Sequence, residues 1–135
     1  MARSILAVVA GFVLTGLLIF ATTAGVLATN PGAFDARNVP TTTGMLVAMH
    51  LYVAVYATLG CWVAARLAPS HPLRHAMIVA VLGVIVNAAN PSIWSTYPLW
   101  SNVISVGSPL LLGWLAGTIR ERQLAASGTP TMVAA

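Results

Sequence analysis

Four long apolar runs with almost no charge limit what this chain can fold into. They cover residues 5–28, 43–65, 73–90 and 99–119. A membrane-spanning helix needs about 20 mainly apolar residues. Lipid leaves only helices or closed barrels as spanning structures, and the runs lack the alternating polarity of barrel strands. The sequence therefore predicts an all-α transmembrane four-helix bundle, with helices near residues 4–29, 42–67, 72–90 and 98–120.

The composition supports lipid as the main solvent of the folded chain. Hydrophobic residues make up 59% of the sequence and charged residues only 6%, whereas soluble domains carry about 25% charged residues. The net charge of +4 comes from scattered arginines without any lysine. Binding to nucleic acid needs a clustered basic surface, so the sequence excludes that class of partner.

The arginines predict the orientation in the membrane. Five of the six lie next to helix ends on one side: Arg3, Arg66, Arg74, Arg120 and Arg122. Only Arg37, close to Asp35, lies on the other side. Because cytoplasmic loops carry an excess of Arg and Lys, we expect both termini in the cytoplasm and a multi-pass protein of the bacterial inner membrane.

The two ends of the chain need separate interpretation. The first apolar run is longer than the roughly 7–15 apolar residues of a secretory signal, so we expect a retained helix. Residues 123–135 are small and polar, which predicts a flexible cytoplasmic tail. Residues 1–122 then form a single transmembrane domain.

The stretch NAANPSIWSTYPLWSN, residues 87–102, interrupts two apolar runs. Pro91 restricts the residue before it and predicts the end of the third helix, and Pro98 suits the first turn of the fourth. We expect a short outer turn, with a binding site as the alternative. Aromatic side chains favour the level of the lipid headgroups, so three residues are predicted as interface anchors: Trp94, Tyr97 and Trp100.

Small residues recur at helical spacing in the first and fourth runs. Helices in lipid approach closely through Gly, Ala, Ser and Thr. The predicted helix-packing residues are Gly11 and Gly25 in the first helix and Gly113 and Gly117 in the fourth. These seams serve packing within the bundle or contact with a partner, and a chain of this size favours internal packing.

One polar residue in each predicted helix falls at the same depth. These residues are Thr22, His50, Asn87 and Ser105. Each lies about 7 to 9 Å from the centre of its run toward the outer face, at a rise of 1.5 Å per residue. Polar groups within a membrane usually face the bundle interior, so the sequence predicts an interior polar layer that could hold a ligand.

Three interpretations of His50 remain open. It is a neutral side chain that shares hydrogen bonds with Asn87 or a threonine, an axial ligand to a haem or chlorophyll-type group, or part of a proton or solute relay. The favoured interpretation needs no cofactor. Acidic residues within the runs would support a relay, but Asp35 and Glu121 both lie outside them.

The sequence contains no recognisable catalytic or metal-binding set. His71 and His75 are four residues apart at the predicted start of the third helix, and two histidines alone are a weak metal site. We interpret them as interfacial residues near headgroup phosphates. Cys61 lies within an apolar run and is expected to be a small buried side chain. We therefore predict a protein that is not an enzyme and holds no metal.

Two segments resemble small uncharacterised bacterial four-helix membrane proteins. In the run GCWVAARLAPSHPLRHA, residues 60–76, a small-residue helix ends in Ala-x-Leu-Ala-Pro and a His-Ala pair opens the next helix. The matching positions are Ala65, Leu67, Ala68, Pro69, His75 and Ala76. The start ILAVVAGFV, from Ile5, is similar too. The resemblance implies four helices in a bacterial inner membrane and no particular activity.

Two classes of function follow. The first is a non-catalytic accessory or structural subunit that packs within a larger membrane complex or a homo-oligomer, supported by the small-residue seams and the aromatic anchors. The alternative is a small transporter or a ligand- or pigment-binding module built on the polar layer around His50. Both predict membrane lipids as partners, and the first also predicts other membrane protein subunits or self-association.

Overall fold

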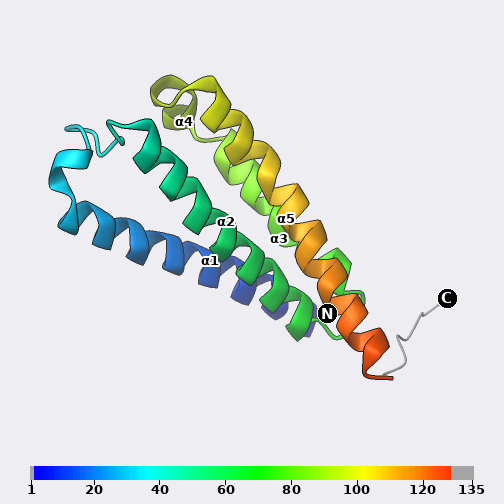
Figure 1. The fold of residues 1–135 in the computed structure, drawn as a ribbon. Helices are drawn as coiled ribbons and strands as arrows, with labels where there is room; N and C mark the ends of the chain where they lie inside the picture. The colour runs from blue at the N-terminus through cyan, green and yellow to red at the C-terminus, as the bar shows by residue number, and fades with distance from the viewer. Residues whose placement is uncertain (1, 129–135) are drawn as a thin grey trace.

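The computed structural model describes residues 2–128, and within them the chain is helical almost throughout (Figure 1). The elements in order are α1 (Ala2–Thr29), the short 3-10 helix η1 (Pro31–Ala33), α2 (Thr43–Leu67), α3 (Pro72–Ala88), α4 (Pro91–Thr96) and α5 (Leu99–Ala126). In the loop between α1 and α2, Phe34 and Pro40 form an isolated antiparallel bridge. The prediction of an all-helical chain is confirmed.

The four longer helices lie side by side, with sequential helices antiparallel (Figure 1). Helix α2 contacts α1, α3 and α5, and α3 also packs along α5. We call the end that holds the start of α1 and the end of α5 the arginine end, because the five arginines lie there. The other end, with the 30–42 loop and α4, is the loop end. The helices are packed closely at the first end and diverge toward the second.

Three helices of the described chain are long and apolar enough to cross a membrane: α1, α2 and α5. Helix α3 is apolar but has only 17 residues. These findings support an integral membrane protein, as the apolar runs predicted.

Two boundaries differ from the sequence predictions. Helix α5 continues to Ala126, so residues 123–126 belong to the helix and not to the predicted tail. Residues 129–135 of that tail lie outside the described chain. The predicted outer turn contains α4, which begins at Pro91. The indole N–H of Trp94 donates to the Ala88 carbonyl at 3.0 Å, which fixes α4 against the end of α3.

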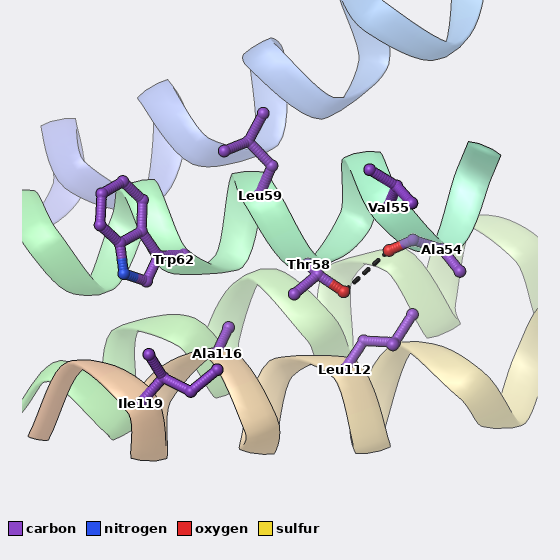
Figure 2. A pocket seen from close by; sticks show the side chains of 8 residues that line it. All are labelled: Ala54, Val55, Thr58, Leu59, Trp62, Leu112, Ala116 and Ile119. Carbon is purple, nitrogen blue, oxygen red and sulfur yellow. Dashed lines mark hydrogen bonds between the residues drawn. The ribbon is translucent and has the colours of Figure 1, made fainter. Parts of the chain in front are cut away.

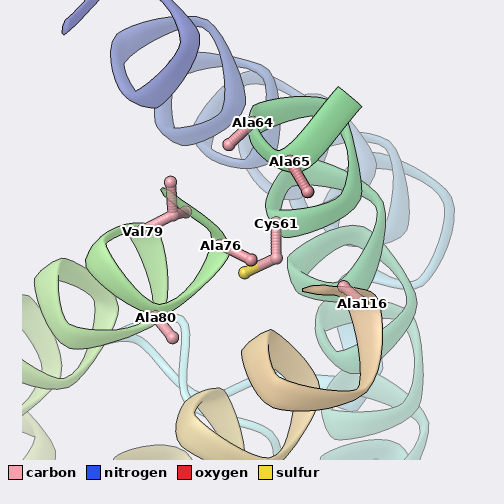
Figure 3. Packing of buried hydrophobic residues seen from close by; sticks show 7 residues of the cluster. All are labelled: Cys61, Ala64, Ala65, Ala76, Val79, Ala80 and Ala116. Atoms are coloured by element: carbon pink, nitrogen blue, oxygen red, sulfur yellow. The ribbon is translucent and has the colours of Figure 1, made fainter. Parts of the chain in front are cut away.

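Small side chains form the core near the arginine end. The cluster contains Cys61, Ala64, Ala65, Ala76, Val79, Ala80 and Ala116, contributed by α2, α3 and α5 (Figure 3). Glycines allow the closest approaches around it. A Cβ added to Gly113 would come within 2.5 Å of the Ala80 side chain, and one added to Gly117 within 2.7 Å of the Leu73 backbone. Helix α5 therefore packs almost backbone to backbone against α3.

Helix α1 packs closely at one glycine and stays apart at the other. A Cβ on Gly11 would overlap the Gly60 carbonyl oxygen of α2. A Cβ on Gly25 would meet nothing within 4 Å, so Gly25, predicted as a packing residue, makes no such contact. Near Gly25 the helices are bridged through tyrosine side chains of α2, which are too large to allow backbone approach.

Candidate functional site

A cavity of about 500 Å³ lies between α1, α2, α3 and α5. The small-residue core closes it toward the arginine end, where Cys61, Val79 and Ala80 line its floor. It extends to Asn90 and Tyr97 at the loop end. We call it the central cavity. Its walls are mainly apolar, with a few polar side chains, which is the usual composition of small-molecule sites.

His50 of α2 is fixed at the cavity wall by both ring nitrogens. Its Nδ1 lies 2.8 Å from the Leu46 carbonyl oxygen, which can only accept, so Nδ1 carries a proton. Its Nε2 lies 3.2 Å from the Ser101 hydroxyl and 3.3 Å from the Ser105 hydroxyl. Either hydroxyl can donate to Nε2. His50 therefore joins α2 to α5, and its Nε2 also lies 3.3 Å from the Ser101 carbonyl oxygen. Its partners in the described chain are two serines and the Leu46 carbonyl, whereas the first interpretation named Asn87 or a threonine.

Asn87 of α3 completes a hydrogen bond that α5 itself lacks. Pro109 has no backbone N–H, so the carbonyl four residues earlier, that of Ser105, loses its usual helical donor. The Asn87 side-chain amide donates to this carbonyl at 3.1 Å. Pro109, Ser105 and Asn87 all line the cavity. The proline that interrupts α5 thus creates an acceptor that α3 satisfies.

The fourth residue of the predicted layer lies elsewhere. The Thr22 hydroxyl pairs with the Tyr56 hydroxyl at 3.0 Å, and the Thr23 hydroxyl pairs with Tyr52 at 2.7 Å. Thr22 does not line the central cavity. The structure therefore brings together His50, Asn87 and Ser105, and it places Thr22 in a separate α1–α2 contact.

The three aromatic residues predicted as interface anchors lie in different surroundings. Trp94, which belongs to α4, is 48% exposed. Tyr97 lines the cavity, and its pKa is raised, mainly by burial and then by negative charge on Tyr52 and Asp35. Its phenol therefore stays protonated and able to donate. The Trp100 ring centroid lies 5.6 Å from that of His50.

Sequence reasoning missed two contributors to this site. Ser101 is 2% exposed and lies one helical turn before Ser105, a spacing that could have indicated it. Asn102, also 2% exposed, donates to the Tyr97 carbonyl at 3.2 Å. That bond sets where the chain enters α5, and no pattern in the sequence indicates it.

The structure corrects the interpretation of His75. It is only 7% exposed, and its Nδ1 lies 3.1 Å from the His71 carbonyl, so it is a buried residue at the start of α3 and not a headgroup contact. His71 is exposed, with a left-handed backbone. Within residues 2–128 no three His, Cys, Asp or Glu side chains lie close enough to hold a metal.

Axial ligation of a haem or chlorophyll-type group does not fit His50 as it is placed. An axial ligand needs one ring nitrogen with a free lone pair. Nδ1 is engaged with Leu46, and Nε2 has two serine hydroxyls within 3.3 Å. Ligation would require Nε2 to leave both serines, and we derive no chemistry from such a group.

Comparison with known proteins gives no relative from which a role could be transferred. No protein-family model, curated protein or solved structure matches this chain. The resemblance to small bacterial membrane proteins stays a prediction.

Proposed function

We propose that this chain is a non-catalytic integral membrane protein that binds a small, neutral, largely apolar molecule in the central cavity. One observation carries the proposal. Polar side chains from α2, α3 and α5 meet at one level on the wall of a cavity bounded by all four longer helices. A mainly apolar cavity with a few convergent polar groups is the expected form of a ligand site.

The lining supports a neutral ligand. Within the described part of the chain no Asp, Glu, Lys or Arg lines the cavity, and an ion buried without a partner would be strongly unfavourable. The phenol of Tyr97 can donate a hydrogen bond, and Asn87 keeps a second N–H beyond the one given to Ser105. A molecule with an apolar body and one or two acceptor oxygens, such as carbonyl or ether groups, suits these donors.

The proposed setting is a four-helix bundle in a bacterial inner membrane with both termini in the cytoplasm. Helix α3, at 17 residues, is about 26 Å long and comes close to the roughly 30 Å hydrocarbon core. The arginine end would face the cytoplasm under the positive-inside rule. The cavity would then be reached from the outer side or from the lipid between the diverging helices.

The closed arginine end supports binding over passage through the protein. Solute transport along this axis would require α3 and α5 to separate where Gly113 and Gly117 bring them together. The accessory-subunit interpretation was supported by the small-residue seams and the aromatic anchors, and the seam glycines Gly11, Gly113 and Gly117 pack within the chain. The binding module could still act alone, as a homo-oligomer or within a larger membrane complex.

The test is a comparison of co-purifying small molecules. Gly83 lines the cavity, and a Cβ there makes only ordinary contact, 3.6 Å from Pro109. Gly83→Leu should fill part of the cavity. Gly107→Leu is the control, since nothing lies within 4 Å of a Cβ at Gly107.

After purification in mild detergent, mass spectrometry should find a neutral compound retained by the wild type and by Gly107→Leu. Gly83→Leu should lose it. The proposal is wrong if no compound is enriched over the detergent blank, or if the filled cavity retains it equally well.

A further inference from the structure

A second, separate hollow lies on the outside of the helices near the arginine end. It has a volume of about 540 Å³ and runs between α2 and α5 (Figure 2). We call it the α2/α5 groove. Ala54 and Ala116 contribute small side chains to it, and Leu59, Leu112 and Ile119 are among its larger ones. It belongs to a different face from the central cavity and shares only Leu112 with it.

The lining of the groove is almost entirely apolar. Among the described residues Thr58 is the only one in the lining with a hydroxyl, which donates to the Ala54 carbonyl within the same helix at 2.8 Å (Figure 2). This local bond leaves no polar group of Thr58 in need of a partner. The groove therefore suits a hydrocarbon chain.

The second polar group among the described residues that line the groove is at its arginine end. Trp62 lines that end, and Figure 2 shows its indole nitrogen on the side of the ring toward α5. Within residues 2–128 the Trp62 indole N–H has no hydrogen-bond acceptor. The Arg66 guanidinium lies 5.2 Å from the Trp62 ring centroid. An N–H donor and a cation thus stand together where the groove reaches the arginine end.

The charges at this end are unbalanced. Five arginines lie there with a single carboxylate, that of Glu121. Arg66 is exposed and so available to an anion outside the chain. Because arginine binds phosphate oxygens well, a membrane phosphate is the complementary group.

The length of the groove matches one leaflet. From Ala54 to Trp62 the groove follows α2 for about 12 Å, which is close to half of the roughly 30 Å hydrocarbon core. A lipid acyl chain from the leaflet at the arginine end would fill the groove and would end near the far end of the groove.

We propose that the α2/α5 groove binds one acyl chain of an anionic glycerophospholipid, with its phosphate held by Arg66 and the Trp62 N–H. The site needs the arginine end to lie at a membrane surface. It does not need the central cavity to bind anything, so either proposal can fail without the other.

The test uses Trp62 as a local reporter. Trp94, Trp100 and Trp114 are replaced by Phe, and the full chain is reconstituted in phosphatidylcholine vesicles. A rising fraction of phosphatidylglycerol brominated on its acyl chains is added, and bromine quenches the Trp62 fluorescence on contact. A parallel series uses brominated phosphatidylcholine.

Brominated phosphatidylglycerol should quench Trp62 with about a fivefold preference, the order expected for one arginine near an anionic lipid. Arg66→Gln should remove most of this preference, and Arg74→Gln should leave it. Ala54→Leu should reduce quenching by both lipids because it fills the groove, whereas Ala48→Leu, on an exposed part of the same helix, should not.

Equal quenching by the two lipids in the protein that keeps only Trp62 would contradict the proposed preference for an anionic headgroup. Unchanged quenching in Ala54→Leu would overturn the acyl chain site. Absence of quenching by either lipid, with cross-linking of Trp62 to a second copy, would show that another copy covers the groove.

Discussion

The two ends of this molecule are built from the same helices but pack by different rules. Near the arginine end, glycines and alanines bring the helix backbones together, as at Gly11 against Gly60. Near the loop end, α1 and α2 are joined through hydroxyl pairs such as Thr23 with Tyr52. His50 and Asn87 connect α2 and α3 to α5 in the same half.

The contrast shows how a small helical protein can combine close packing with an internal cavity. Lipid provides little hydrophobic force between helices, so contact depends on close packing and on interhelical hydrogen bonds. Small residues allow close packing and leave no space between the helices. Larger polar residues form interhelical hydrogen bonds, hold the helices apart and leave the central cavity between them.

The largest expected effect is on the closely packed end. Gly11→Ala should destabilise the fold by about 1–3 kcal/mol, because the added methyl overlaps the Gly60 carbonyl. Gly25→Ala, on the same helix, adds the same methyl into open space and should change stability little. Thermal unfolding in detergent, followed by circular dichroism, measures both. Equal destabilisation by the two would mean that the ends do not differ in packing.

The next effect concerns the acceptor created by Pro109. Asn87→Leu should destabilise by about 1–3 kcal/mol, because it leaves the Ser105 carbonyl without a donor. Pro109→Ala restores the helical N–H, so the double variant Asn87→Leu with Pro109→Ala should be more stable than the sum of the single changes predicts. The same unfolding measurement decides this. Strict additivity would show that Asn87 does not act through that carbonyl.

A smaller effect is expected where His50 joins two helices. His50→Phe keeps a ring but loses the bonds to the Ser101 and Ser105 hydroxyls, and should cost about 1 kcal/mol. Thr58→Val removes a hydroxyl bonded only within its own helix and should cost less. Unfolding in detergent compares them, and a larger loss for Thr58→Val would contradict the role of His50 as an interhelical link.

The smallest effect lies in the 30–42 loop. The Asp35 carboxylate accepts from the backbone N–H groups of Val39 and Arg37, which lower its pKa below the ordinary value of 3.8. The stabilisation of the loop by the ionised carboxylate is present above pH 3.8. It is lost as the pH falls through the lowered pKa of Asp35. Hydrogen exchange at the Arg37 and Val39 amides should accelerate over that range relative to other loop amides. In Asp35→Asn this pH dependence should disappear.

The helix positions were largely predictable from the sequence. The apolar runs predicted the starts of α1, α2, α3 and α5 to within a few residues, and Pro98 indicated the start of α5. The end of α5 was missed because the end of an apolar run indicates only where the hydrocarbon region ends. A helix with good helix formers such as Arg120 and Glu121 can continue into water. The six-residue α4 was missed because it is too short for any periodicity.

The candidate site was predictable in depth but not in direction. Counting residues along each helix places Thr22 at the level of His50, Asn87 and Ser105. Only the packing shows that Thr22 points to Tyr56 and away from the cavity. The rotation of a helix about its axis depends on its neighbours, and a sequence without strong amphipathicity leaves that rotation open.

The amino-acid sequence alone specifies an apolar helical chain with five of its six arginines at one end and a proline that deprives the Ser105 carbonyl of a donor. These properties are local, set by composition and by covalent geometry. Only the packed fold shows that Asn87 supplies the missing donor, that His50 faces α5, and that a cavity lies between them. Such contacts join residues far apart in the chain, and they depend on how closely small and large side chains allow four helices to approach.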